Sequence, residues 1–115
     1  MSESSSTPIL ILNNGPLIDS IKLNMDQIKK AAHVIRSINH KLRRNILSLI
    51  EQNKQLTVTD IMIKLRLEQS VVSQHLAILR FHDVVKTKRE GKFIYYSINK
   101  ERLGEIISLI DKLAK

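Results

Sequence analysis

One short stretch of this sequence, residues 84–98, interrupts a pattern that is mainly helical from residue 19 onward. It contains two runs rich in β-branched and aromatic residues, 84–89 and 92–98, with only Glu90-Gly91 between them. A glycine in a two-residue connection is typical of a β-hairpin. The chain has only three glycines and two prolines, so few irregular loops are expected elsewhere. The sequence therefore predicts a mainly α fold that carries one two-stranded β ribbon.

Helical periodicity covers most of the remaining chain. Apolar residues recur at spacings of three and four, which places them on one face of each helix. We expect Thr57 or Thr59 to cap a short third helix, Asn53 to end the second and Asn99 to begin the last. The predicted helices span residues 19–39, 40–52, a short segment that ends near Leu65, 70–81 and 100–114.

The N-terminal residues differ in composition from the rest. Residues 1–7 are rich in serine, and the strong breaker Asn13-Asn14-Gly15-Pro16 follows. A chain of 115 residues fits one domain. We therefore predict a flexible arm over residues 1–18 and a single domain over residues 19–115.

The chain is strongly basic, with 19 lysines and arginines, 11 acidic residues, a formal charge of +8 and a pI near 10.0. Such a surplus favours a polyanionic partner, nucleic acid before an anionic membrane surface. The absence of cysteine excludes disulfides, thiolate metal sites and cysteine nucleophiles. No apolar run approaches the roughly 20 residues that span a bilayer, and none resembles a signal-peptide core, so we expect a cytoplasmic protein.

Two helices joined by a short turn and followed by a basic hairpin make a winged helix-turn-helix. The helix over 70–81 opposes its apolar face with short or polar side chains at Ser70, Ser73, Gln74 and Ala77. Side chains of this size allow a helix to enter a major groove about 12 Å wide, where Gln can pair with adenine and Ala can contact a thymine methyl. The same face could equally be the solvated side of an amphipathic helix.

The cations around the hairpin favour DNA binding by the 70–81 helix over a merely solvated face. Four of them surround one tight turn, where they could neutralise phosphates beside the groove, although lysines also commonly blunt an exposed strand edge. For His75 a phosphate contact and local packing are equally good interpretations, and either Tyr95 or Tyr96 could face DNA. The predicted DNA-binding residues are Gln69, Ser70, Ser73, Gln74, His75, Ala77, Arg80, Lys86, Lys88, Arg89, Lys92, Tyr95 and Tyr96.

The residues from Ser70 to Arg80, SVVSQHLAILR, together with Val84-Val85, Lys88-Arg89-Glu90-Gly91-Lys92 and Tyr95-Tyr96-Ser97-Ile98, resemble the ArsR/SmtB-type family of bacterial winged-helix repressors. The resemblance extends over about residues 35–98. It implies a homodimer built from the first and last helices. It also implies operator binding by the 70–81 helix and the wing, with release when an effector binds.

The metal sites of that family are altered here. Where metal sensors carry a Cys-Val-Cys-Asp type of box, this chain has Thr57-Val58-Thr59-Asp60. The last helix holds Glu101, Glu105 and Asp111 but no histidine. Hydroxyls and scattered carboxylates are poor ligands for zinc, cobalt or nickel. We therefore expect no metal and no cofactor, and the effector stays open.

Asp83 and the pair His33 and His40 also bear on the fold and on metal binding. Asp83 stands where the family usually has glycine, and aspartate tolerates the left-handed backbone conformation. His33 and His40 lie seven residues apart and could share a helix face, but two nitrogens alone make a weak metal site.

The first and last helices each carry an apolar stripe that exceeds what a small winged domain needs for its own core. Exposed apolar stripes usually mark an interface, although both helices could simply close the core of one subunit. The predicted dimer-interface residues are Ile21, Met25, Ile28, Ala32, Leu103, Ile106, Ile107, Ile110 and Leu113.

These observations favour a dimeric, sequence-specific regulator of transcription, acting as a repressor on double-stranded operator DNA without a membrane partner. The alternative is a basic winged-helix module that docks a protein or an acidic surface and does not bind DNA specifically. We expect no enzymatic activity, because the sequence has no Gly-rich phosphate loop, no nucleophile elbow and no metal-binding trio.

Overall fold

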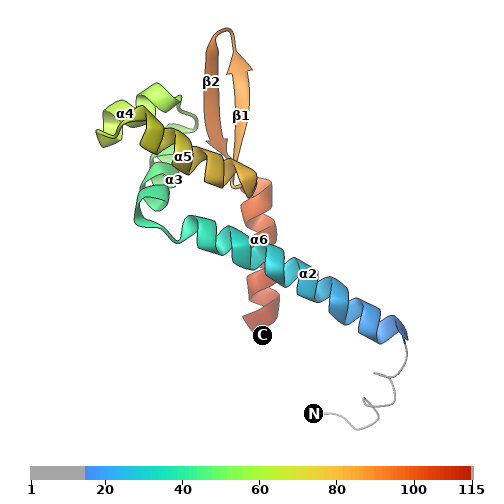
Figure 1. The fold of residues 1–115 in the computed structure, drawn as a ribbon. Helices are drawn as coiled ribbons and strands as arrows, with labels where there is room; N and C mark the ends of the chain where they lie inside the picture. Colours follow the sequence, from blue (N-terminus) through green and yellow to red (C-terminus); the bar gives the residue numbers. More distant parts are fainter. Residues whose placement is uncertain (1–14, 115) are drawn as a thin grey trace. The chain divides into compact units, whose positions relative to one another are not determined.

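The computed structural model describes the backbone of residues 15–114 and the side chains of residues 25–114. Two units divide the chain, residues 1–31 and 32–115. Within the described residues, no helix is both long enough and apolar enough to cross a membrane. The elements are α2 (Gly15–Ile38), α3 (Lys41–Asn53), α4 (Val58–Leu65), α5 (Gln69–Phe81), β1 (Val85–Glu90), β2 (Phe93–Ile98) and α6 (Lys100–Ala114) (Figure 1). This order confirms a winged helix-turn-helix that is mainly α with a two-stranded wing.

Helix α2 begins at Gly15 instead of Asp19, so the last residues of the predicted arm are already helical. Residues 1–14 of that arm lie outside the described part of the chain. Near its C-terminal end, the hydroxyl of Ser37 donates to the carbonyl oxygen of Val34 at 2.6 Å, and both residues are buried.

The ends of α3 are set by local side chains. His40 is its N-cap, and the ring Nδ1 accepts the backbone N–H of Leu42 at 3.2 Å. Asn53 is not the predicted C-cap: Lys54 takes that position with φ +70°, and the Asn53 side chain donates to the Leu49 carbonyl at 2.9 Å. Because the Asn53 side-chain amide bonds a carbonyl of the preceding helical turn, Asn53 is the last residue of α3 and not its cap.

The short helix α4 is held at its start by a capping box. Thr57 Oγ1 accepts the N–H of Asp60 at 3.1 Å, and the Asp60 carboxylate accepts the N–H of Thr57 at 3.0 Å. Thr57 is therefore the cap, as one of the two predicted alternatives. Arg66 ends α4 in the left-handed conformation at φ +55°, and α5 begins at Gln69, one residue before the predicted start at Ser70.

The core lies where α3, α4, α5 and the base of the wing meet. Its side chains are almost fully inaccessible, and burial of each is worth about 1.5–3 kcal/mol. They come from separate elements, so the core fixes the two helices of the helix-turn-helix against α3. The largest fully buried side chains of these elements are Ile46, Ile50, Ile61, Val72, Leu76, Leu79, Val84 and Val85.

The wing is an antiparallel hairpin in which Val85 pairs with Ile98 and Glu90 with Phe93. Its two-residue connection is Gly91-Lys92, one residue later than the predicted Glu90-Gly91. Gly91 has φ +61°, the sign that a type II′ turn requires at its first central residue. The register that lets Glu90 pair with Phe93 therefore sets the turn.

Two further contacts anchor the wing at its base. Leu56 forms an isolated bridge with Tyr96, with N–O distances of 3.0 and 2.8 Å, which ties β2 to the link between α3 and α4. Asn99 caps α6 as predicted, because its side-chain oxygen accepts the N–H of Arg102 at 3.2 Å. Asp83 adopts φ +58° before β1, which confirms that aspartate tolerates this turn.

Candidate nucleic-acid interface

Helix α5 presents one polar face to solvent. Ser70, Ser73, Gln74 and Ala77 are all exposed. On the opposite side, Val72, Leu76 and Leu79 are at most 1% exposed and pack in the core. We call the four exposed residues the α5 ridge. The ridge is small and hydrophilic, so it can approach another surface closely without first being uncovered.

The start of α5 is open to an anion. Its N-cap, Glu68, makes no side-chain hydrogen bond to the first turn, and the first helical bond is from the N–H of Val72 to the Glu68 carbonyl at 3.1 Å. The N–H groups of Gln69 and Ser70 precede that bond, and both residues are exposed. Backbone N–H groups at a helix N-terminus attract phosphates.

The wing rises from the C-terminal end of α5 (Figure 1). Three of its cations lie close to the turn that joins β1 and β2. Lys88, Arg89 and Lys92 are exposed. Lys88 Nζ lies 3.6 Å from a carboxylate oxygen of Glu90, but such exposed pairs contribute little and exchange readily. Arg89 Nε donates to the Gly91 carbonyl at 3.1 Å, and these three cations form what we call the wing tip.

Three other predicted wing residues lie elsewhere on the hairpin. Lys86 is exposed at the base, paired in register with Ser97. Tyr95 and Tyr96 are both half-buried: Tyr96 is tied through its backbone to Leu56, whereas the Tyr95 ring lies 6.4 Å from that of Phe93 nearer the tip.

His75 turns toward α3. Its ring lies 4.9 Å from the ring of His40, and its Nδ1 is 3.3 Å from Nη1 of Arg43. Burial, followed by the nearby charges of His40 and Arg43, lowers the pKa of His75 below its usual value of 6.5. The structure thus places His75 in local packing with α3. A contact between His75 and phosphate stays a prediction.

His82, the C-cap of α5, belongs to a second imidazole pair. Its ring stacks on that of His33 at 6.2 Å and 13°, and Arg36 Nη2 lies 2.8 Å from Nδ1 of His33. Burial lowers the pKa of His82, and the charges of His33 and Arg102 add to the effect. His33 and His40 do not share a helix face as considered, because His40 lies outside α2 and faces His75 instead.

Arg80 and Gln69, the remaining predicted contacts on α5, are exposed at its two ends. Among the described side chains, no three or more His, Cys, Asp or Glu residues gather closely enough to hold a metal ion. The Thr57 hydroxyl and the Asp60 carboxylate are occupied in the capping box.

Helix α6 leaves much of its apolar stripe uncovered. Ile107, Ile110 and Leu113 are 60%, 42% and 58% exposed, whereas Ile106 is buried within the subunit. A groove of about 440 Å³ runs between this stripe and the segment around Ile35 and Ile38. The predicted interface residues Leu103 and Ala32 are half-buried, Met25 is exposed, and the Ile21 side chain lies outside the described residues.

Comparison with known proteins adds independent observations. The family described as bacterial regulatory proteins of the arsR family matches residues 40–87. The transcriptional repressor PagR of Bacillus anthracis is 36% identical over 92 residues, which cover 80% of this chain and 92% of PagR. An HTH-type transcriptional regulator of Methanocaldococcus jannaschii is 35% identical over 89 residues, 77% of this chain and 100% of that protein.

Solved structures agree with this. The crystal structure of PagR from Bacillus anthracis has a TM-score of 0.63 and 37% identity, covering 74% of this chain and 98% of that one. The transcriptional regulator HlyU from Vibrio vulnificus has a TM-score of 0.60 and 32% identity, covering 82% and 97%. The sequence and structure comparisons therefore point to the same group of proteins.

Proposed function

The chain belongs to the arsR family of bacterial regulatory proteins, and we propose that it is a dimeric repressor that binds one double-stranded operator sequence. The family consists of DNA-binding regulators and not of enzymes. The observation that carries the proposal is the α5 ridge, an exposed row of small and polar side chains on a helix whose other face is fixed in the core.

The ridge enters the major groove of the operator. Gln74 reads an adenine edge, Ser70 and Ser73 bond base edges or phosphates, and Ala77 contacts a thymine methyl. Gln69 and Arg80 flank these contacts at the ends of α5. The wing tip neutralises phosphates beside the groove, and one of the two wing tyrosines, Tyr95 or Tyr96, bonds a phosphate near it.

The exposed apolar stripe on α6 supports the dimer. Three large aliphatic side chains in a row would be an unusual surface for a monomer, and a second copy would cover them. Met25, and Ile28 and Ala32 on the same helix α2, join this interface. Two-fold pairing places two α5 helices about one helical turn apart, roughly 34–36 Å, so the operator is palindromic.

Control of the repressor does not run through the metal sites usual in the family. Thr57 and Asp60 hold the start of α4, and the acids of α6 have no histidine beside them on that helix. The remaining alternatives are a small organic ligand, a protein partner or no effector at all. The protein acts in the cytoplasm, where the chromosome lies.

The proposal is tested by binding the full chain to a library of genomic duplexes over a series of salt concentrations. We expect one palindromic motif to be enriched, and affinity for it to fall steeply with salt. Equal binding of all duplexes would show that the protein binds DNA without sequence specificity. No binding at low salt by folded protein would instead favour a module that docks a protein partner.

Repression is tested separately with a reporter gene placed behind the enriched sequence. We expect expression to fall when the protein is supplied and to recover when the ridge carries Gln74→Ala. A rise in expression would mean that the regulator activates its target.

A further inference from the structure

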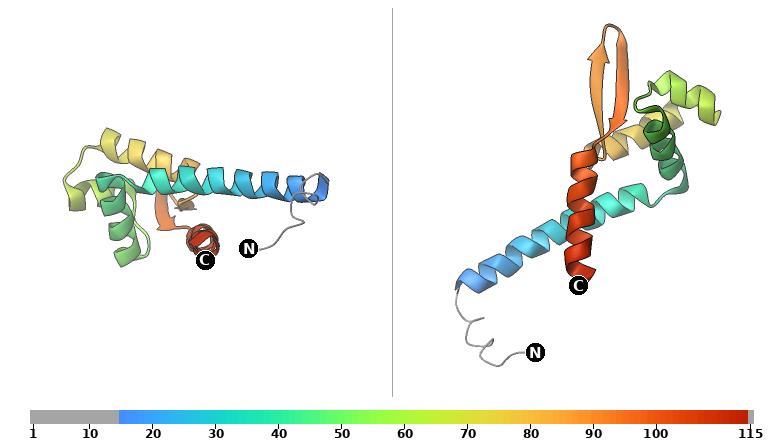
Figure 2. Two further views of the ribbon diagram at one scale, coloured as in Figure 1. Left: turned by 90° about the horizontal axis from the view of Figure 1, so that it is seen from below. Right: turned by 180° about the vertical axis from the view of Figure 1, so that it is seen from behind.

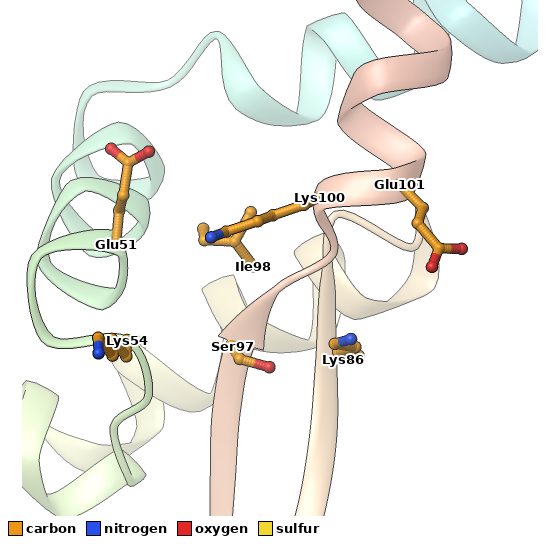
Figure 3. A pocket seen from close by; sticks show the side chains of 7 residues that line it. All are labelled: Glu51, Lys54, Lys86, Ser97, Ile98, Lys100 and Glu101. Atoms are coloured by element: carbon orange, nitrogen blue, oxygen red, sulfur yellow. The ribbon is translucent and has the colours of Figure 1, made fainter.

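A hollow of about 410 Å³ lies at the base of the wing, away from the tip (Figure 3). Three lysines line it, and each comes from a different element: Lys54 follows α3, Lys86 belongs to β1 and Lys100 begins α6. Ser97 on β2 contributes a hydroxyl, while Glu51 and Glu101 stand at the margins. The volume falls in the range of sites that hold small molecules.

The lysines of this hollow form no ion pair within 4 Å with the acids that line it. Among the described residues, the one ion pair within 4 Å joins Lys88 to Glu90 near the wing tip. In Figure 3, Lys100 extends from α6 toward α3, whereas the carboxylates of Glu51 and Glu101 point away on either side. Lys100 therefore crosses the hollow, Lys54 and Lys86 stand on either side of Ser97, and neither carboxylate points toward Lys100.

The backbone that carries these lysines is fixed. Lys54 sits at φ +70° as the C-cap of α3. Lys86 is paired in register with Ser97, next to the bridge between Leu56 and Tyr96. Lys100 follows the Asn99 cap, so the positive end of the α6 dipole adds to the charge of the hollow. Only the side chains must be ordered when a ligand binds.

This hollow faces away from the α5 ridge. In Figure 1, α5 lies in front of α3, and in the view from behind in Figure 2, α3 and α6 lie in front of α5. Figure 3 likewise shows α5 behind the strands of the wing. The ridge is the outward side of α5, because Val72, Leu76 and Leu79 are buried toward the core. A duplex seated on the ridge therefore lies on the other side of the unit.

We propose that this hollow binds a small anion that carries at least two phosphate groups, such as the diphosphate portion of a nucleotide. Ammonium groups are common point-charge partners of phosphate, and three of them exceed the charge of the two marginal acids. A polyanion gains from all three lysines at once, which a monovalent carboxylate cannot. The site is additional to the operator contacts, and Lys86 belongs to it instead of to the DNA interface.

The experiment measures binding of inorganic pyrophosphate to the full chain by calorimetry at constant ionic strength. We expect one site per chain. Lys54→Gln, Lys86→Gln and Lys100→Gln should each weaken binding about two- to fivefold, as the loss of one exposed charge pair would. Glu51→Gln should tighten binding, because it removes a repelling carboxylate.

Lys64→Gln on α4 is the matched control, because it removes the same charge from an exposed position outside the hollow. If it weakens pyrophosphate binding as much as the three substitutions do, the anion responds only to the overall charge of the chain and the proposal is wrong. Absence of measurable pyrophosphate binding to the folded wild-type chain would also overturn it.

A second arm identifies the source of the phosphate. Lys54→Gln and Lys100→Gln are titrated with duplex DNA over a salt series, alongside Lys88→Gln at the wing tip. We expect the first two to leave the salt dependence unchanged. If they reduce it as much as Lys88→Gln does, the hollow contacts the DNA backbone, and the small-molecule site is refuted.

Discussion

The guanidinium Nη1 of Arg43 lies 3.3 Å from Nδ1 of His75, which joins the first turn of α3 to the middle of α5. A guanidinium can only donate, so Nδ1 accepts and the imidazole is neutral with its proton on Nε2. If His75 were protonated, its Nδ1–H would face the N–H of Arg43, and this hydrogen bond would be lost. This polar contact between α5 and α3 therefore requires an uncharged His75.

A second histidine, at the C-terminal end of α5, is also held in its neutral form. His82 stacks on His33, and the charges of Arg102, Arg43 and Arg36 add to the effect of burial in lowering its pKa. Both α5 histidines therefore bind protons less readily in the folded chain than in the unfolded chain, where the pKa is near 6.5. Folding stability from these groups is complete above that pH and is lost as the pH falls through it toward the lower folded value.

We expect the melting temperature to be highest above pH 7 and to decline as the pH is lowered from 7 to 5.5. The measurement is thermal unfolding followed by circular dichroism at constant ionic strength. The double variant His75→Gln, His82→Gln should show a flatter profile over the same interval, since glutamine does not titrate. An equally steep decline in the double variant would show that other groups cause it.

Gln74→Ala should relax the sequence preference of the protein at one base position of each half-site. A glutamine paired with an adenine edge discriminates against the wrong base by about 1–3 kcal/mol, and the alanine variant loses that difference. Competition between matched and single-substituted duplexes measures it. Gln52→Ala, on the exposed side of α3, is the control and should leave the preference as in the wild type.

Lys88→Ala should act differently from Gln74→Ala. A lysine that contacts phosphate carries no base information, so all duplexes should bind more weakly by a similar factor. The slope of log affinity against log salt should fall in magnitude by about one for each subunit. Lys64→Ala removes the same charge from α4 and serves as the control. A loss confined to one sequence would contradict the phosphate role.

The features that the sequence predicts are those set by residues close together in the chain. The exposed α5 ridge, the Asn99 cap and the order of elements were predictable, because side chains within a few residues determine them. The same local signals narrowed the α4 cap to Thr57 or Thr59 without deciding between the two. The contact of His75 with Arg43 joins residues 32 positions apart, and the lysine hollow draws on three elements, so no local spacing signals either. The wing turn was misplaced by one residue because Gly91 fits either position, and strand pairing decides between them.

Thr57→Ala should destabilise the protein by about 1 kcal/mol, the usual cost of losing an N-cap side chain. The variant lacks the acceptor for the Asp60 N–H, and the reciprocal bond from the Thr57 N–H to the carboxylate loses its support. Urea unfolding measures the change. Thr59→Ala, at an exposed position outside the capping box, should cost less, and Thr57→Ser should retain most of the wild-type stability.

Ile107→Glu should convert the proposed dimer into a monomer. Ile107 is 60% exposed on the uncovered stripe of α6, so a carboxylate there is solvated in the single subunit but would be buried at the interface without a partner. Light scattering after size exclusion should give 13.2 kDa for the variant and twice that for the wild type. Operator affinity should fall as well, because two half-sites are no longer read together.

Ile63→Glu is the control for this change. It places the same charge on the exposed side of α4, where Ile63 is 70% exposed, and should stay dimeric. If both variants are monomeric, or neither is, α6 does not form the interface.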